Sequence, residues 1–210
     1  MELTQALHTL PLVAILRGVQ ADEVEAVAEA VYAAGIRIIE VPLNSPVPFD
    51  SIARLQKLLG DRCLCGAGTV LTVADVDRVA AAGGRLIVTP NTDSAVIQRA
   101  ITLNLTVMPG FATASEAFQA YAAGARYLKL FPAGTYGTGH LSALTAVLPA
   151  DAKVLAVGGV SADNAQRWLQ AGAIGLGMGS ELYRAGDSVA EVSRKAENLV
   201  QALRSSMPSS

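Results

Sequence analysis

A single lysine lies in the middle of a short apolar stretch, where a charged ammonium group is costly to bury. Lys129 is one of four lysines in the chain, and its surroundings read Tyr127-Leu128-Lys129-Leu130-Phe131-Pro132. Burial lowers the pKa of a lysine from about 10.4 toward neutrality. The neutral amine can add to a ketone and form an imine. We therefore interpret Lys129 as a reactive amine that acts as a nucleophile.

Glu40 offers the carboxylate that imine chemistry requires. A protonated imine withdraws electrons from the neighbouring carbon, so a carbon–carbon bond can break, and a carboxylate must then move protons in both directions. Glu40 lies near the end of a predicted strand over residues 36–41. Side chains alternate along strands, so Glu40 and Lys129 can enter the same cavity. A buried Lys129–Glu40 ion pair without any catalytic role is the alternative.

Apolar strands alternate with amphipathic helices along the whole chain, at intervals of roughly 20 to 27 residues. Eight strand–helix units with parallel pairing predict a closed (β/α)8 TIM barrel, which is an α/β fold. A doubly wound open sheet is the alternative, but the first strand is not followed by G-x-G-x-x-G. The predicted strands span 12–16, 36–41, 63–67, 85–88, 105–108, 127–131, 154–157 and 174–178.

Composition and charge favour a single domain with reduced cysteines. The 210 residues are 51% hydrophobic and carry a formal charge of −2, which gives no basic surface for nucleic acid. Cys63 and Cys65 stand two residues apart in a strand, a poor geometry for a disulfide, so we expect reduced thiols. We expect one domain over 1–204, a disordered tail over 205–210, no signal peptide or membrane span, and a cytoplasmic location.

Several unusual residues follow the predicted strand ends, where the active sites of barrels form. Gly158-Gly159 after the seventh strand and Gly179-Ser180 after the eighth predict a phosphate cradle, although ordinary tight turns would also explain them. Arg17 could bind a carboxylate or phosphate, or form a salt bridge at the rim. Thr69 could donate to a carboxylate or cap a helix.

Six segments carry a family resemblance. They are Ala14-Ile15-Leu16-Arg17-Gly18, Ile39-Glu40-Val41-Pro42-Leu43-Asn44-Ser45-Pro46, Gly66-Ala67-Gly68-Thr69-Val70-Leu71, Val88-Thr89-Pro90-Asn91, Leu128-Lys129-Leu130-Phe131-Pro132 and Val157-Gly158-Gly159-Val160. In this order they resemble the 2-keto-3-deoxy-6-phosphogluconate (KDPG) and 6-phosphogalactonate (KDPGal) aldolases. The resemblance implies a class I aldolase on a (β/α)8 barrel, without metal or cofactor, assembled as a homotrimer. It also implies cleavage of a phosphorylated keto-deoxy sugar acid to pyruvate and glyceraldehyde 3-phosphate, with no nucleic-acid or membrane partner.

The resemblance also implies a role for each matching residue. Lys129 matches the imine-forming lysine, and Glu40 matches the general acid and base. Thr69 matches the threonine near the pyruvate carboxylate. Pro90 and Phe131 match residues that line the pyruvyl pocket. The phosphate-binding positions of the family are matched by Gly158, Gly159 and Ser180.

Two positions resemble the galactonate branch of this family. Gluconate enzymes typically carry Leu-Arg-Thr after the glutamate strand, with the arginine on the substrate carboxylate, whereas this chain has Leu43-Asn44-Ser45. They also carry threonine where Val157 stands, and only a hydroxyl could bond the C4 hydroxyl of one epimer. The resemblance therefore implies KDPGal cleavage, with Arg17 as the remaining cation for the carboxylate. The alternatives are a KDPG aldolase, an enzyme that accepts both epimers, and a non-catalytic phosphosugar-binding barrel.

Overall fold

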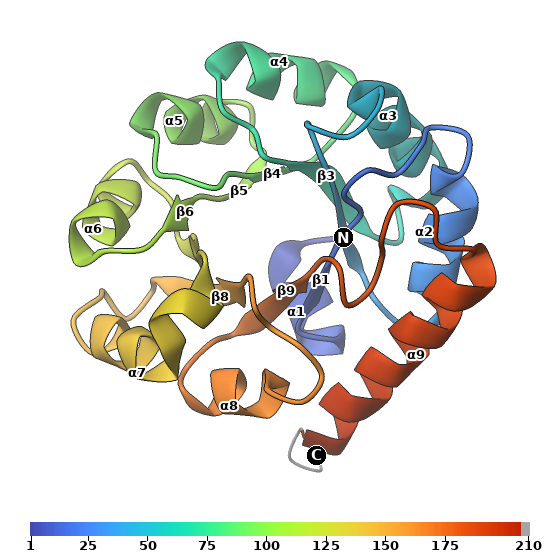
Figure 1. The fold of residues 1–210 in the computed structure, drawn as a ribbon. Coiled ribbons are helices and arrows are strands. Elements are labelled where there is room, and N and C mark those ends of the chain that lie inside the picture. The colour runs from blue at the N-terminus through green and yellow to red at the C-terminus, as the bar shows by residue number, and fades with distance from the viewer. Residues whose placement is uncertain (207–210) are drawn as a thin grey trace.

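The structure, a computed structural model, is a barrel of parallel strands surrounded by helices (Figure 1). It describes residues 1–206. The strands follow the order β5-β4-β3-β2-β1-β9-β8-β7-β6, which confirms the predicted (β/α)8 barrel and makes the open sheet wrong. The strands are β1 (Leu12–Ile15), β2 (Ile38–Pro42), β3 (Leu64–Gly68), β4 (Leu86–Val88), β5 (Thr106–Met108), β6 (Gly110–Phe111), β7 (Tyr127–Leu130), β8 (Lys153–Val157) and β9 (Gly175–Met178).

The barrel closes at a break in its fifth strand. β5 and β6 are consecutive segments separated by Pro109, which has no N–H to donate to a ladder. β5 pairs with β4 and β6 pairs with β7, while the backbone N–H of Lys129 donates to the Pro109 carbonyl at 2.8 Å. The Thr89 hydroxyl accepts from the N–H of Gly110 at 3.1 Å. The closing seam therefore lies directly beside Lys129.

The helices form a ring around the strands (Figure 1). One of them, α7, is kinked, because Gly137 within it has a φ of 81°. The ring consists of α2 (Val24–Ala33), α3 (Pro48–Leu59), α4 (Val73–Ala81), α5 (Ser94–Thr102), α6 (Ala114–Ala122), α7 (Ala133–Thr145), α8 (Ala165–Gln170) and α9 (Val189–Ser206).

Two hydrophobic layers hold the barrel together. Outward-facing strand residues such as Leu128 and Leu130 pack against the helices, as the alternation predicts. The barrel interior forms a separate cluster, and helix α1 (Leu3–Thr9) packs Leu3 and Leu7 into it. The Thr4 and Tyr127 hydroxyls share a hydrogen bond of 2.7 Å that fixes α1 to the start of β7. Helix α1 therefore closes the end of the barrel where the strands begin.

The start of helix α4 settles one alternative. The Thr72 hydroxyl accepts from the N–H of Asp75 at 3.1 Å, so Thr72 is the N-cap of α4. Thr69, for which a capping role was an alternative, lies three residues before this cap.

Two further expectations were the absence of a membrane span and a disordered C-terminal tail. Among residues 1–206, no helix combines the length and apolar character that crossing a bilayer requires. The tail expected over 205–210 lies partly outside the described residues. Within them, α9 continues through Ser206.

Substitution of Gly110 by alanine tests the closing seam. An alanine Cβ there would overlap the backbone of Pro90 and lie 2.8 Å from the Thr89 carbonyl oxygen. We expect Gly110→Ala to lower the free energy of unfolding by roughly 1–3 kcal/mol, measured by urea denaturation. Gly139→Ala is the matched control, since nothing lies within 4 Å of its Cβ position and helix propensity favours alanine. Equal stability of the two variants would contradict this assignment.

Candidate active site

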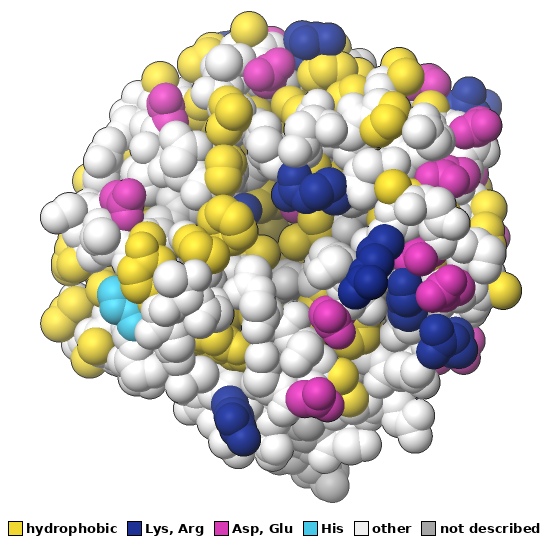
Figure 2. Space-filling view, in the orientation of Figure 1, with side chains coloured by type: hydrophobic (Ala, Val, Ile, Leu, Met, Phe, Trp, Pro, Cys, Tyr) yellow, Lys and Arg dark blue, Asp and Glu magenta, His cyan; other side chains and the backbone are white. Residues whose placement is uncertain are grey.

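All eleven candidate residues line one cleft, of about 180 Å³, at the carboxyl ends of the strands. Figure 2 shows a hollow near the middle of this face, with hydrophobic side chains on its floor and Lys or Arg side chains beside it. The candidates that the fold brings together are Arg17, Glu40, Thr69, Pro90, Lys129, Phe131, Val157, Gly158, Gly159, Gly179 and Ser180.

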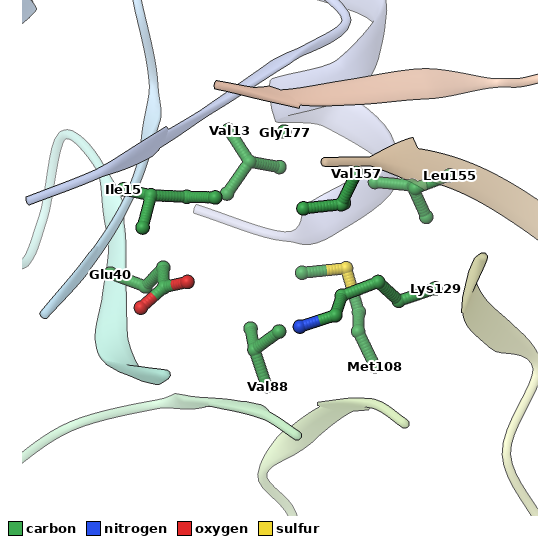
Figure 3. A pocket seen from close by; sticks show the side chains of 9 residues that line it. All are labelled: Val13, Ile15, Glu40, Val88, Met108, Lys129, Leu155, Val157 and Gly177. Carbon is green, nitrogen blue, oxygen red and sulfur yellow. The ribbon is translucent and has the colours of Figure 1, made fainter. Parts of the chain in front are cut away.

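Lys129 and Glu40 face each other across the barrel interior. β7 carries Lys129 and β2 carries Glu40, and these strands lie on opposite sides of the barrel. The two residues are only 7% and 3% exposed. Figure 3 shows both charged ends pointing into one space among apolar side chains. This space, about 10 Å³, is lined by Val13, Ile15, Glu40, Val88, Met108, Lys129, Leu155, Val157 and Gly177.

Burial brings the pKa values of both groups close to neutrality. Desolvation raises the pKa of Glu40 to about 7, against the lowering effect of the Lys129 and Arg17 charges. Desolvation lowers the pKa of Lys129 to about 8, against the raising effect of Glu40, and Arg17 lowers it further. Among the described residues, no salt bridge within 4.0 Å joins Lys129 to any carboxylate. The alternative, a structural ion pair between Lys129 and Glu40, would require a salt bridge that these two residues do not form.

Gly68 makes room for the carboxylate of Glu40. A Cβ at position 68 would overlap the Glu40 carboxylate, so any larger residue would displace it. Glu40 Oε2 is buried and has no hydrogen-bond partner in the described part of the chain. An unpartnered buried carboxylate oxygen is destabilising, and such groups often mark functional sites. Thr69 follows directly, with a left-handed φ of 54° that is also unfavourable for a β-branched residue.

Two glycine turns also line the cleft. Gly158 and Gly159 have φ values of 88° and 76°, which favour glycine. The N–H of Gly134, in the first turn of α7, donates to the Gly158 carbonyl at 2.7 Å and fixes this turn. Gly179 and Ser180 follow β9 beside it.

The cleft is also lined by four residues that the sequence analysis did not predict as site residues: Ile15, Val160, Gly177 and Glu181. Gly177 leaves room for Val157, because a Cβ at position 177 would lie 2.7 Å from a Val157 methyl. Side-chain alternation along the eighth predicted strand could have identified Gly177 as a residue that faces the barrel interior. Glu181 directly follows Ser180 in the turn after that strand, so its place beside the predicted phosphate site could also have been predicted.

The cysteines and histidines contribute nothing to this cleft. Cys63 and Cys65 are free, buried thiols, and burial raises their pKa values to about 11 and about 12. Within residues 1–206, no group of three His, Cys, Asp or Glu side chains is arranged to hold a metal ion. The amine of Lys129 and the carboxylate of Glu40 are the titratable pair that faces the interior of this cleft.

A barrel that places a desolvated lysine opposite a desolvated glutamate has the parts of a lysine-dependent lyase. The family model described as KDPG and KHG aldolase matches residues 3–197. The chain is 50% identical over 195 residues to 2-dehydro-3-deoxy-6-phosphogalactonate aldolase of Escherichia coli (strain K12), covering 93% of this chain and 95% of that protein. The chain belongs to the KDPG and KHG aldolase family.

Two further comparisons agree with this family. The chain is 48% identical over 186 residues to the probable 2-dehydro-3-deoxy-6-phosphogalactonate aldolase of Rhizobium meliloti (strain 1021), covering 89% of this chain and 88% of that protein. A solved structure described as native KDPGal superposes with a TM-score of 0.92 at 50% identity, covering 94% of this chain and 96% of that one. The resemblance seen in the sequence motifs is thus confirmed.

The pKa of Lys129 can be measured directly. The chain has four lysines, so the side-chain amines can be followed individually by ¹⁵N NMR. We expect Lys129 to titrate near pH 8. Glu40→Gln should lower its pKa, because the carboxylate favours the ammonium form, and Arg17→Ala should raise it. The exposed Lys57 and Lys153 are internal controls. A Lys129 pKa near 10.4 would contradict the desolvated amine.

Proposed function

We propose that this protein is a class I aldolase that cleaves KDPGal, or 2-dehydro-3-deoxy-6-phosphogalactonate, to pyruvate and D-glyceraldehyde 3-phosphate. The observation that carries the proposal is the buried pair of Lys129 and Glu40, which face each other without a salt bridge. The choice of the galactonate epimer is supported by the 50% identity to the Escherichia coli enzyme of that name.

The reaction begins with the neutral amine of Lys129. Its nitrogen attacks the C2 ketone, and loss of water gives a protonated imine, or Schiff base. Glu40 takes the proton from the C4 hydroxyl, the C3–C4 bond breaks, and its electron pair remains on C3 as an enamine. Glyceraldehyde 3-phosphate leaves as the aldehyde. Glu40 then returns a proton to C3, and water hydrolyses the imine to release pyruvate and the free amine.

The two pKa values suit these steps. A carboxyl group with a pKa of about 7 can both accept and donate a proton near neutral pH. An amine with a pKa of about 8 is partly neutral at the same pH, as nucleophilic attack requires. The absence of a hydrogen bond to Glu40 Oε2 among the described residues is consistent with an oxygen that bonds substrate.

The other lining residues receive the rest of the substrate. Arg17 and Thr69 would bind the carboxylate, and Pro90 and Phe131 would enclose the pyruvyl group. Phe131 supports this role through its position, since its ring centroid lies 4.8 Å from Lys129 Nζ. Val157 would face the epimeric C4 carbon. The phosphate would bind at the turns formed by Gly158, Gly159, Gly179 and Ser180.

Three properties stay predictions. The homotrimer and a place in galactonate degradation follow from the family resemblance, and the cytoplasmic location follows from the composition and the reduced cysteines. Each can be tested separately from catalysis, and none is needed for the chemistry proposed for Lys129.

A two-epimer assay tests the proposed activity. Pyruvate release is followed with lactate dehydrogenase, and we expect kcat/KM for KDPGal to exceed that for KDPG by at least about tenfold. Lys129→Met should abolish cleavage, because it removes the nucleophile and keeps a similar volume. A preference for KDPG, or equal constants, would establish one of the alternative substrates. Cleavage of neither epimer by the wild-type protein would support the non-catalytic barrel. Full activity in folded Lys129→Met would contradict the mechanism.

A further inference from the structure

Two hydrogen bonds join the loop after β2 to the loop after β1. Arg17 Nη1 donates to Asn44 Oδ1 at 2.9 Å, and the N–H of Gly18 donates to Ser45 Oγ at 2.9 Å. Ser45 is buried, and its own N–H donates to the Pro42 carbonyl at 2.9 Å. The loop that carries Asn44 is thus fixed, and it fixes the backbone that carries Arg17.

Arg17 is the permanent cation of the cleft. Among the described residues, it and Lys129 are the only Lys or Arg side chains that line the cleft, and Lys129 is used as the nucleophile. Its hydrogen bond to Asn44 occupies one of five guanidinium N–H groups. No salt bridge to Arg17 occurs within the described part of the chain. Its charge therefore remains available to an anion.

The position of Arg17 distinguishes the two anionic groups of the substrate. The N–H of Leu16 donates to the Glu40 carbonyl at 3.0 Å, so Arg17 follows directly beside Glu40 and lines the same cleft as Lys129. The C1 carboxylate is bonded to C2, the atom that Lys129 attacks. The phosphate is at C6, the opposite end of the substrate. Arg17 is therefore placed for the carboxylate.

We propose that Asn44 is a positioning residue for recognition of the substrate carboxylate, an inference that rests on the proposed aldolase function. Asn44 accepts one N–H of Arg17 and thereby orients the planar guanidinium, whose other N–H groups face the C1 carboxylate. An amide suits this role because it orients Arg17 without neutralising it. An aspartate at the same position would form an ion pair with Arg17 and compete with the substrate.

Steady-state kinetics in the direction of aldol addition separate the two ends of the substrate. We expect Asn44→Ala to raise KM for pyruvate by roughly threefold to tenfold, with kcat within about twofold and KM for glyceraldehyde 3-phosphate unchanged. Asn44→Asp should raise KM for pyruvate further. In an Arg17→Ala background, Asn44→Ala should have no additional effect, because Asn44 acts through Arg17. Asn198→Ala, on the exposed face of α9, is the matched control.

Other outcomes would overturn the inference. An unchanged KM for pyruvate in Asn44→Ala, or an equal effect with and without Arg17, would show that Asn44 does not act through the guanidinium. A rise only in KM for glyceraldehyde 3-phosphate would assign the pair to the phosphate. These results require a wild-type enzyme that is active. A wild-type protein that catalyses neither addition nor cleavage would instead refute the proposed function.

Discussion

The reactivity of the site depends on the desolvation of two opposite charges inside one barrel. Lys129 and Glu40 enter the interior from opposite strands, and the residues beneath them are apolar. Helix α1 packs into the other end of the interior, which seals it from that side. Gly68 leaves the space that the Glu40 carboxylate occupies, and the closing seam at Pro109 holds the backbone of Lys129. The fold thus creates one small polar pair within an otherwise hydrophobic interior.

This arrangement reduces stability at neutral pH and gains reactivity. The folded-state pKa of Glu40 is raised, so its contribution to stability is present below about pH 4.5 and is lost as pH rises through about 7. The pKa of Lys129 is lowered, so its contribution is present above about pH 10.5 and is lost as pH falls through about 8. Both groups therefore oppose folding near neutrality. Functional sites commonly retain such unfavourable groups.

Sequence patterns predicted the barrel and the cleft because both follow from local rules. Alternation along β2 and β7 directed Glu40 and Lys129 inward, and strand ends located the glycine turns. Contacts between distant segments were not predictable in this way. The bond between Arg17 and Asn44 joins two loops, and the contact of Gly68 with Glu40 depends on strand register. The break at Pro109 was also not predictable from the sequence, because it becomes evident only from the pairing of β5 with β4 and of β6 with β7 in the closed barrel.

The proposed mechanism requires that the amine of Lys129 forms a covalent imine with substrate. Borohydride reduction in the presence of pyruvate, followed by peptide mass mapping, tests it most directly. We expect one reduced adduct, on Lys129, and none at Lys57, Lys153 or Lys195. A protein that cleaves substrate without any adduct, or an adduct on another lysine, would contradict it.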